Sequence, residues 1–232
     1  MCGRYTLRVS PAELAELFAV INSFDWSPRY NIAPTQSVAA VRAAHDSSGR
    51  ELALLKWGLI PSWATDPKIG SSLINARAET VAVKPAFRSA FRKRRCLIAV
   101  DGFYEWQAIA GQKSKQPYYI AVRDVPAFAF AGLTEHWSSP EGSTLDSCTI
   151  ITTMANSLMQ SIHHRMPVIL DPADYDRWLD PARQDPQDLL PLLAPFPADQ
   201  MQLVPVSTLV NSPRNESPEC IVPISDHRAE VE

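Results

Sequence analysis

The residues with the clearest chemical potential stand at the very start of the chain, Met1-Cys2-Gly3-Arg4-Tyr5. Cysteine has a small side chain, so we expect Met1 to be removed, leaving Cys2 with a free α-amine and a thiol two carbons apart. The amine can condense with an aldehyde to a Schiff base, and the thiol can then close a thiazolidine ring on the same carbon. Ordinary pKa values of about 7.7–8.0 for the amine and about 8.5 for the thiol leave a reactive fraction of each near neutral pH. The alternative is a disordered terminus whose second residue is cysteine by chance.

Glu105 is the most informative internal residue. It stands near the end of a predicted strand, between Tyr104 and Trp106, and shares a strand face with Phe103. Burial among such side chains disfavours the charged form and raises the pKa of a carboxyl, which suits proton transfer near neutral pH. The alternatives are a carboxylate that points to solvent or one that pairs with an arginine.

Several polar side chains elsewhere in the chain suit supporting roles. His163 and His164 compete for the place of a second acid–base group, and one ring can face a pocket while the other stays exposed. Asn75 can donate a hydrogen bond to a carbonyl or hydroxyl oxygen. Arg77 and Arg165 suit phosphate contact, because the guanidinium fork matches phosphate oxygens.

The composition limits the classes of protein to which these groups belong. The net charge of −3 over 232 residues gives no global attraction to nucleic acid, so binding of that kind requires a local basic surface. The four cysteines lie far apart without a CxxC pair, which predicts neither a zinc site nor a disulfide framework, and we expect no cofactor. There is no apolar run of about 18 residues and no signal-peptide pattern. We therefore expect a cytosolic protein without membrane contact.

The elements that must position these groups are mostly short strands. Asn22 to Gln36 shows no periodicity and is predicted to be an ordered loop, and residues 45–49 form a turn-rich connection. Proline-led or polar caps predict helices at Pro11 to Val20, at Pro85 to Arg95, at Ser157 to His163 and after both Asp171-Pro172 and Asp185-Pro186. Strands are predicted at Ser37–Ala43, Glu51–Leu59, Cys96–Val100, Gln116–Arg123, Phe128–Thr134, Cys148–Thr153, Val168–Leu170 and Met201–Ser207.

These elements predict an α+β fold, mainly an antiparallel β-sheet that closes into a barrel, with short flanking helices. We expect one domain over residues 1–225 and a frayed tail over 226–232, because no repeat or low-complexity linker divides the chain. No heptad pattern indicates an oligomer, so we expect a monomer. Trp57 and Trp63 flank a loop, where core packing is the stronger expectation and a stacking surface for bases is the alternative.

Six motifs, in this order along the chain, resemble one known family. It is the SOS response-associated peptidase (SRAP) family, which shields abasic sites in single-stranded DNA. The resemblance covers nearly the whole chain, with a weaker match at Pro205-Val206-Ser207, Asn211 and Asn215. The six motifs are Met1-Cys2-Gly3-Arg4; Arg29-Tyr30-Asn31 with Ala33-Pro34; Trp57-Gly58 with Pro61 and Trp63; Asn75-Ala76-Arg77-Ala78-Glu79; Asp101-Gly102-Phe103-Tyr104-Glu105-Trp106; and Ile162-His163-His164-Arg165-Met166-Pro167.

The resemblance implies a role for each motif residue. Cys2 would form a stable thiazolidine crosslink with the ring-opened aldehyde of an abasic site. Asn75 would orient the ring or a sugar oxygen, Glu105 would transfer protons during Schiff-base formation and ring closure, and His163 would assist sugar opening. The residues expected to contact the DNA are Arg4, Pro34, Trp63, Arg77, Trp106 and Arg165. Single-stranded DNA with abasic sites is thus the implied partner, and the protein would lie on the nucleoid when bound.

Two rival functions remain open from the sequence. In the first, Cys2 is the nucleophile of a cysteine peptidase, with His163 or Glu105 as base. In the second, the arginines and tryptophans form a non-covalent module that binds single-stranded DNA. The family is also credited with removing its own Met1, and the sequence leaves open whether a general aminopeptidase does so here. Arginines within the motifs, set against acidic residues in the last third, predict a basic groove on an otherwise acidic molecule.

Overall fold

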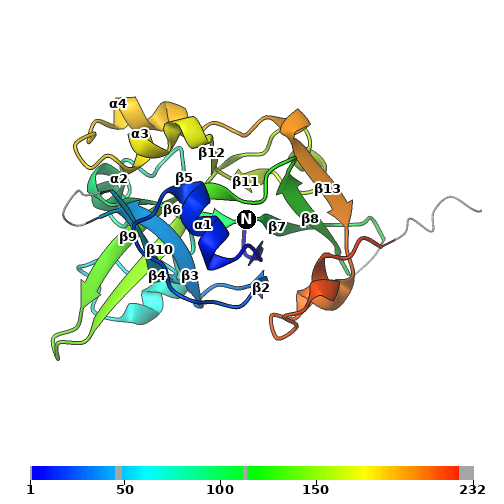
Figure 1. The fold of residues 1–232 in the computed structure, drawn as a ribbon, viewed down its shortest axis with the longest axis horizontal. Helices are drawn as coiled ribbons and strands as arrows, with labels where there is room; N and C mark the ends of the chain where they lie inside the picture. The colour runs from blue at the N-terminus through cyan, green and yellow to red at the C-terminus, as the bar shows by residue number, and fades with distance from the viewer. Residues whose placement is uncertain (1, 45–48, 112–113, 225–232) are drawn as a thin grey trace, which may run out of the picture.

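The computed structural model describes residues 2–44, 49–111 and 114–224. Its strands form two sheets, with short helices on the outside (Figure 1). The predicted connection at 45–48 and the predicted tail at 226–232 lie outside the described residues. The predicted α+β fold with a mainly antiparallel, barrel-like sheet is confirmed.

The larger sheet contains a closed ring of five strands. They are β3 (Ser37–Ala43), β4 (Arg50–Trp57), β6 (Arg95–Val100), β9 (Phe128–Ser138) and β10 (Thr144–Met154). In ring order, β4 pairs with β3, β3 with β6, β6 with β9 and β9 with β10, all antiparallel, and β10 closes the ring by a parallel pairing with β4. Closure leaves no free edge between these strands.

Three short strands extend the ring and carry predicted site residues. β5 (Asn75–Arg77) runs parallel to β10, and β11 (Arg165–Pro167) runs antiparallel to it. β12 (Ile169–Leu170) pairs with β9. Residues far apart in the sequence, Asn75 to Arg77 and Arg165, are therefore held along one strand.

The second sheet is fully antiparallel, in the order β13-β8-β7-β1-β2. Its central strand β7 pairs with β1 through Tyr5↔Phe103 and, on its other side, antiparallel with β8 through Glu105↔Tyr118. The start of the chain lies near the middle of the view in Figure 1, and Cys2 packs into the main hydrophobic core. The strands are β1 (Tyr5–Leu7), β2 (Arg29–Ile32), β7 (Gly102–Gln107), β8 (Gln116–Val122) and β13 (Met201–Pro205).

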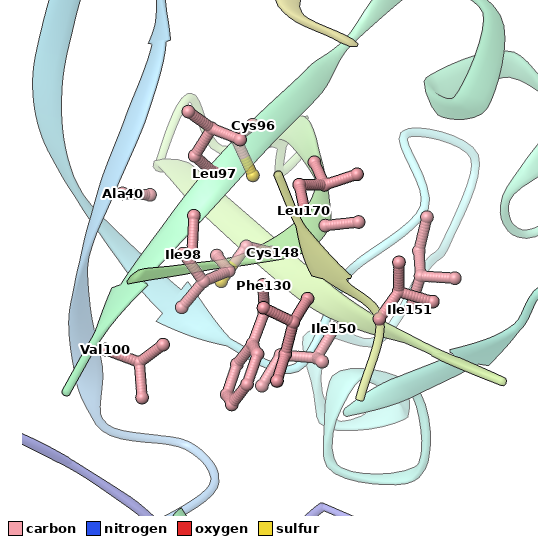
Figure 2. Close-up of a cluster of buried hydrophobic side chains, with 14 of the residues drawn as sticks. Ala40, Cys96, Leu97, Ile98, Val100, Phe130, Cys148, Ile150, Ile151 and Leu170 are labelled. Carbon is pink, nitrogen blue, oxygen red and sulfur yellow. The ribbon is translucent and has the colours of Figure 1, made fainter. Parts of the chain in front are cut away.

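The inside of the ring is filled by apolar side chains from β3, β6, β9 and β10 (Figure 2). Ile98, Phe130 and Ile150 are fully buried there. Burial of each such side chain stabilises the fold by about 1.5–3 kcal/mol. The thiols of Cys96 and Cys148 belong to the same cluster and form no disulfide.

Helices are short. Predicted caps begin the helix at Pro11–Phe18, the 3-10 turn at Pro172–Asp174 and the helix at Pro186–Leu189, whereas the helix at Arg88–Lys93 has no side-chain cap. In α1 (Pro11–Phe18) the backbone N–H of Glu13 donates to Ser10 Oγ (3.2 Å), and the Glu13 carboxylate accepts from the Ser10 backbone N–H (2.9 Å). Leu14 and Phe18 are buried, whereas Leu17 is exposed. The other helices are α2 (Arg88–Lys93), α3 (Tyr175–Leu179) and α4 (Pro186–Leu189); 3-10 turns lie at Pro67–Ser72, Met159–Ser161, Pro172–Asp174, Leu190–Leu193, Ala198–Gln200, Thr208–Asn211 and Pro218–Ile221.

Several predicted boundaries were wrong. The expected loop from Asn22 to Gln36 contains β2, and neither β1 nor β5 was predicted. These strands have three or four residues and mixed polarity, so tertiary pairing rather than periodicity defines them. The helix expected over Ser157 to His163 is reduced to a 3-10 turn at Met159–Ser161, where the Met159 N–H donates to Asn156 Oδ1 at 3.0 Å.

Candidate active site

Cys2 is fully buried, and its backbone is held by the predicted amide. Asn75 Nδ2 donates to the Cys2 carbonyl oxygen at 2.8 Å, and the Arg4 backbone forms a hydrogen bond with the thiol. Burial raises the pKa of the Cys2 thiol well above its ordinary value, and the nearby Glu105 carboxyl raises it further. The thiol is therefore neutral around pH 7.

Glu105 lies on β7, the strand that pairs with the N-terminal strand. The Tyr104 N–H donates to the Arg4 carbonyl oxygen at 3.0 Å, which extends this pairing toward Cys2. The Glu105 side chain is 4% exposed, so the solvent-facing alternative is excluded. Burial raises its pKa above the ordinary value, as predicted from its apolar neighbours.

Asn75 stands at the start of β5, opposite Ile150 of β10. With its Nδ2 engaged by Cys2, its Oδ1 is buried and receives no hydrogen bond from any described residue. The structure therefore brings Cys2, Asn75 and Glu105 together from three separate segments.

The two histidines divide as predicted, one half-buried and one exposed. The rings of His163 and His164 stack with centroids 4.4 Å apart. His163 Nδ1 lies 3.0 Å from the Arg165 backbone nitrogen and 3.1 Å from the Arg165 carbonyl oxygen, so the Arg165 backbone holds this ring nitrogen in either tautomer. Burial lowers the pKa of His163, so the ring is neutral around pH 7. The histidine loop is tied to the end of β7, because Gln107 Nε2 donates to the Ser161 carbonyl oxygen at 2.9 Å.

Arg165 is buried and its guanidinium fork faces protein oxygens. Nη1 lies 2.5 Å from Glu79 Oε1, and Nη2 lies 3.0 Å from Glu79 Oε2 and 2.5 Å from the Thr152 carbonyl oxygen. Hydrogen bonds from Arg165 lower the pKa of Glu79. A phosphate would thus have to share this fork with Glu79, whereas Arg77 is exposed and no described residue bonds its guanidinium.

Of the remaining predicted DNA-contact residues, Arg4 and Trp106 lie together. The Arg4 guanidinium sits 5.8 Å from the Trp106 ring centroid, and both line a shallow depression with Lys115 and Asn211. Arg4 is half-buried, and burial lowers its pKa below the ordinary value.

Trp57 and Trp63, which flank one loop, differ in burial, so one fits the predicted core packing and the other fits the predicted stacking surface. Trp57 is fully buried and donates from Nε1 to the Ile74 carbonyl oxygen at 2.9 Å, whereas Trp63 is 61% exposed. Pro34 is half-buried beside β2.

Two larger hollows, of about 720 and 640 Å³, contain none of the predicted site residues and lie around Leu179 and Pro181. Among the described residues, no group of His, Cys, Asp and Glu could hold a metal ion, and no helix is long and apolar enough to cross a membrane.

Comparison with known proteins identifies the group to which this site belongs. The model of the SOS response associated peptidase (SRAP) family matches residues 1–213. The chain belongs to the SRAP family. It is 47% identical to abasic site processing protein YoqW of Bacillus subtilis, over 95% of this chain and 99% of that one. It is 37% identical to abasic site processing protein HMCES of Xenopus tropicalis, over 87% of this chain and 66% of that one.

The fold is shared with solved structures as well. A protein from Bacteroides thetaiotaomicron with a crystal structure superposes with a TM-score of 0.87 at 26% identity, over 97% of this chain and all of that one. The SRAP family and its fold are thus established for this chain.

Within the SRAP motifs, three buried or paired residues had received no individual role from the sequence. Asp101 holds β1 against β7, its carboxylate accepting from the Arg8 backbone N–H (2.6 Å), from Arg8 Nε (3.0 Å) and from the Thr6 hydroxyl. Glu79 pairs with Arg165, and Asn31 contacts Arg4. Their only signal in the sequence was membership of the recognised motifs.

Proposed function

We propose that this SRAP protein crosslinks itself to abasic sites in single-stranded DNA through Cys2, and so shields the lesion. The observation that carries the proposal is the assembly of Cys2, Asn75 and a buried Glu105 in a chain close in sequence to abasic site processing proteins. The proposed activity makes the protein a crosslinking enzyme with lyase-like Schiff-base chemistry rather than a turnover hydrolase.

The first step would require removal of Met1, whether autocatalytic or not. Removal creates the α-amine of Cys2 and changes the surroundings of a thiol that is fully buried while Met1 is present. The amine would then attack the aldehyde carbon of the ring-opened sugar. The carbinolamine would lose its hydroxyl as water once that oxygen receives a proton. Glu105 is suited to donate this proton near neutral pH, because its pKa is raised.

Ring closure would follow on the same carbon. The carbon–sulfur bond forms as the C=N electron pair of the protonated Schiff base moves to nitrogen, and the thiol proton passes to the Glu105 carboxylate, which restores the acid that protonated the departing water. Because burial keeps the thiol protonated, a base beside it is required before it becomes an effective nucleophile. The overall change is loss of one water.

His163 and Asn75 would act on the sugar. The closed sugar must exchange a proton between its hydroxyl and ring oxygen to open, and a neutral imidazole can serve in that exchange because one ring nitrogen donates a proton and the other accepts one. The buried Asn75 Oδ1 offers an acceptor for a sugar hydroxyl.

DNA contact would come from the surrounding cations and rings. Arg4 and Arg77 would hold phosphates, and Arg165 would do so by sharing its fork with Glu79. Exposed Trp63 offers a face for stacking, while Trp106 and Pro34 would contact the strand beside the lesion.

The rival peptidase function requires the Cys2 thiol to attack peptide bonds and has no need of the free α-amine. Extending the chain by one uncleavable residue before Cys2 separates the two. Thiazolidine chemistry predicts complete loss of the DNA adduct, whereas thiol-only catalysis predicts retained activity on a peptide. A purely non-covalent module predicts equal affinity for intact and abasic strands, with no effect of Cys2→Ser.

A further inference from the structure

We infer that Asn31 is a positioning residue for the Cys2 thiol, acting through Arg4, and that the C-terminal loop of residues 206–224 is thereby part of the active site. The inference deepens the proposed crosslinking function and rests on it for its effect on rate. The claim that Asn31 restrains the Cys2 side chain does not depend on that function.

Arg4 joins the nucleophile to the rest of the molecule at three points. Its backbone forms a hydrogen bond with the Cys2 thiol, and its carbonyl oxygen accepts from the Tyr104 N–H at 3.0 Å. Its guanidinium donates to Asn31 Oδ1 at 2.7 Å. The placement of the thiol therefore depends on how firmly Arg4 is held.

The guanidinium of Arg4 is held mainly by the C-terminal loop. Nη1 donates to the Val210 carbonyl oxygen at 2.8 Å and Nη2 to the Asn211 carbonyl oxygen at 3.3 Å. The Asn211 side chain also accepts from Trp106 Nε1 at 2.7 Å, on the ring that lies against Arg4.

Asn31 sits at the junction of Arg4 and this loop, with no exposed surface. Its Oδ1 accepts from Arg4, and its Nδ2 lies within hydrogen-bond distance of the carbonyl oxygens of Val210 (3.2 Å), Ser212 (2.9 Å) and Asn215 (2.8 Å). One amide thus holds the loop in the curve that presents its carbonyl groups to Arg4. An apolar residue here would remove the donor that these three carbonyl groups share and the acceptor of Arg4 Nη1.

A second contact fixes the same loop to β2. The Glu216 carboxylate accepts from the backbone N–H groups of Tyr30 and Asn31, and forms an ion pair with Arg29 at 2.9 Å. Glu216 does not touch Arg4, so attachment of the loop and positioning of Arg4 are separable.

The test compares Asn31→Ala with Asn22→Ala. Asn22 is a matched control, because its amide also bridges backbone groups, Nδ2 donating to the Leu52 carbonyl oxygen (2.9 Å) and Oδ1 accepting from the Leu52 N–H (2.7 Å), away from Arg4. Each variant is incubated with a saturating single-stranded oligonucleotide carrying one abasic site, with and without borohydride. Borohydride traps the Schiff base but leaves the closed thiazolidine unchanged, so the two measurements separate condensation from ring closure.

We expect Asn31→Ala to slow ring closure at least tenfold and to raise the trapped fraction, while Asn22→Ala behaves as wild type after allowance for any change in melting temperature. Normal ring closure in Asn31→Ala at saturating DNA would overturn the inference. The inference would also be overturned if ring closure slowed in both variants in proportion to their loss of stability. If Asn31→Ala fails to fold, Arg4→Lys replaces it, because a lysine keeps the charge but lacks the fork; ring closure at the wild-type rate would then contradict us.

A separate readout tests the restraint without DNA. Iodoacetamide alkylation of Cys2, followed by mass spectrometry of the N-terminal peptide, should be several-fold faster in Asn31→Ala than in wild type or Asn22→Ala, because the thiol is less confined. Equal rates would refute the inference even if wild type crosslinks. Conversely, faster alkylation in a protein that forms no DNA adduct would sustain the restraint and reject the proposed function.

Discussion

At the scale of single residues, the proposed crosslinking depends most on the buried carboxyl of Glu105 beside the Cys2 thiol. Glu105 is 4% exposed and its pKa is raised by burial, so both of its protonation states are accessible closer to neutral pH than for an ordinary glutamate. We expect Glu105→Gln to slow adduct formation by about 10²-fold or more, the usual contribution of a positioned acid–base group. Single-turnover rates on an abasic oligonucleotide provide the measurement. A variant that crosslinks at the wild-type rate would remove Glu105 from the mechanism.

The same carboxyl has a consequence for stability. A folded-state pKa above the unfolded value means that the charged carboxylate disfavours folding at higher pH, and that this cost disappears below the ordinary glutamate range, where both states are protonated. Glu105→Gln should therefore be more stable than wild type at pH 8, with the gain shrinking toward pH 4. Urea unfolding at both pH values tests this, and a variant less stable at pH 8 would contradict it.

At the scale of elements, β10 organises the site by pairing with both β5 and β11. Glu79 follows β5 and Arg165 begins β11, so the Glu79–Arg165 ion pair links these two segments. Because hydrogen bonds from Arg165 lower the pKa of Glu79, the pair stabilises the fold above the ordinary glutamate range and this contribution is lost as pH falls through the lowered pKa. With the Glu79 side chain 47% exposed, we expect Glu79→Gln to cost only about 1 kcal/mol at pH 7 and nothing at pH 3. Equal losses at both pH values in chemical denaturation would be evidence against this account.

The sequence predicted the elements with strong periodicity and missed those defined by pairing. Ser37–Ala43 was predicted with its observed bounds, because a buried apolar run between turn signals determines it locally. The strand at Arg29–Ile32 could not be predicted, because its pairing with β1 and its contacts with residues 210–216 come from distant parts of the chain. The burial of Glu105 followed from its neighbours, whereas the link from Asn31 to Arg4 required coordinates.

At the scale of the whole molecule, a net charge of −3 makes binding to DNA depend on a few local cations. If Arg4, Arg77 and Arg165 contact phosphates, the logarithm of the binding constant for intact single-stranded DNA should fall against the logarithm of salt concentration with a slope of about −2. Fluorescence anisotropy between low and moderate ionic strength gives this slope. Cys2→Ala should keep both the slope and the affinity, since the covalent step is absent from this equilibrium. A binding constant that does not change with salt concentration would argue against a basic groove.

The central claim is tested most directly by intact mass. The purified protein is incubated with a single-stranded oligonucleotide that carries one abasic site, and the product is weighed under denaturing conditions. The account predicts a species equal to the Met1-less protein plus the DNA minus one water, absent from a Cys2→Ala control. No such species, with Met1 shown to be removed, would contradict crosslinking through Cys2.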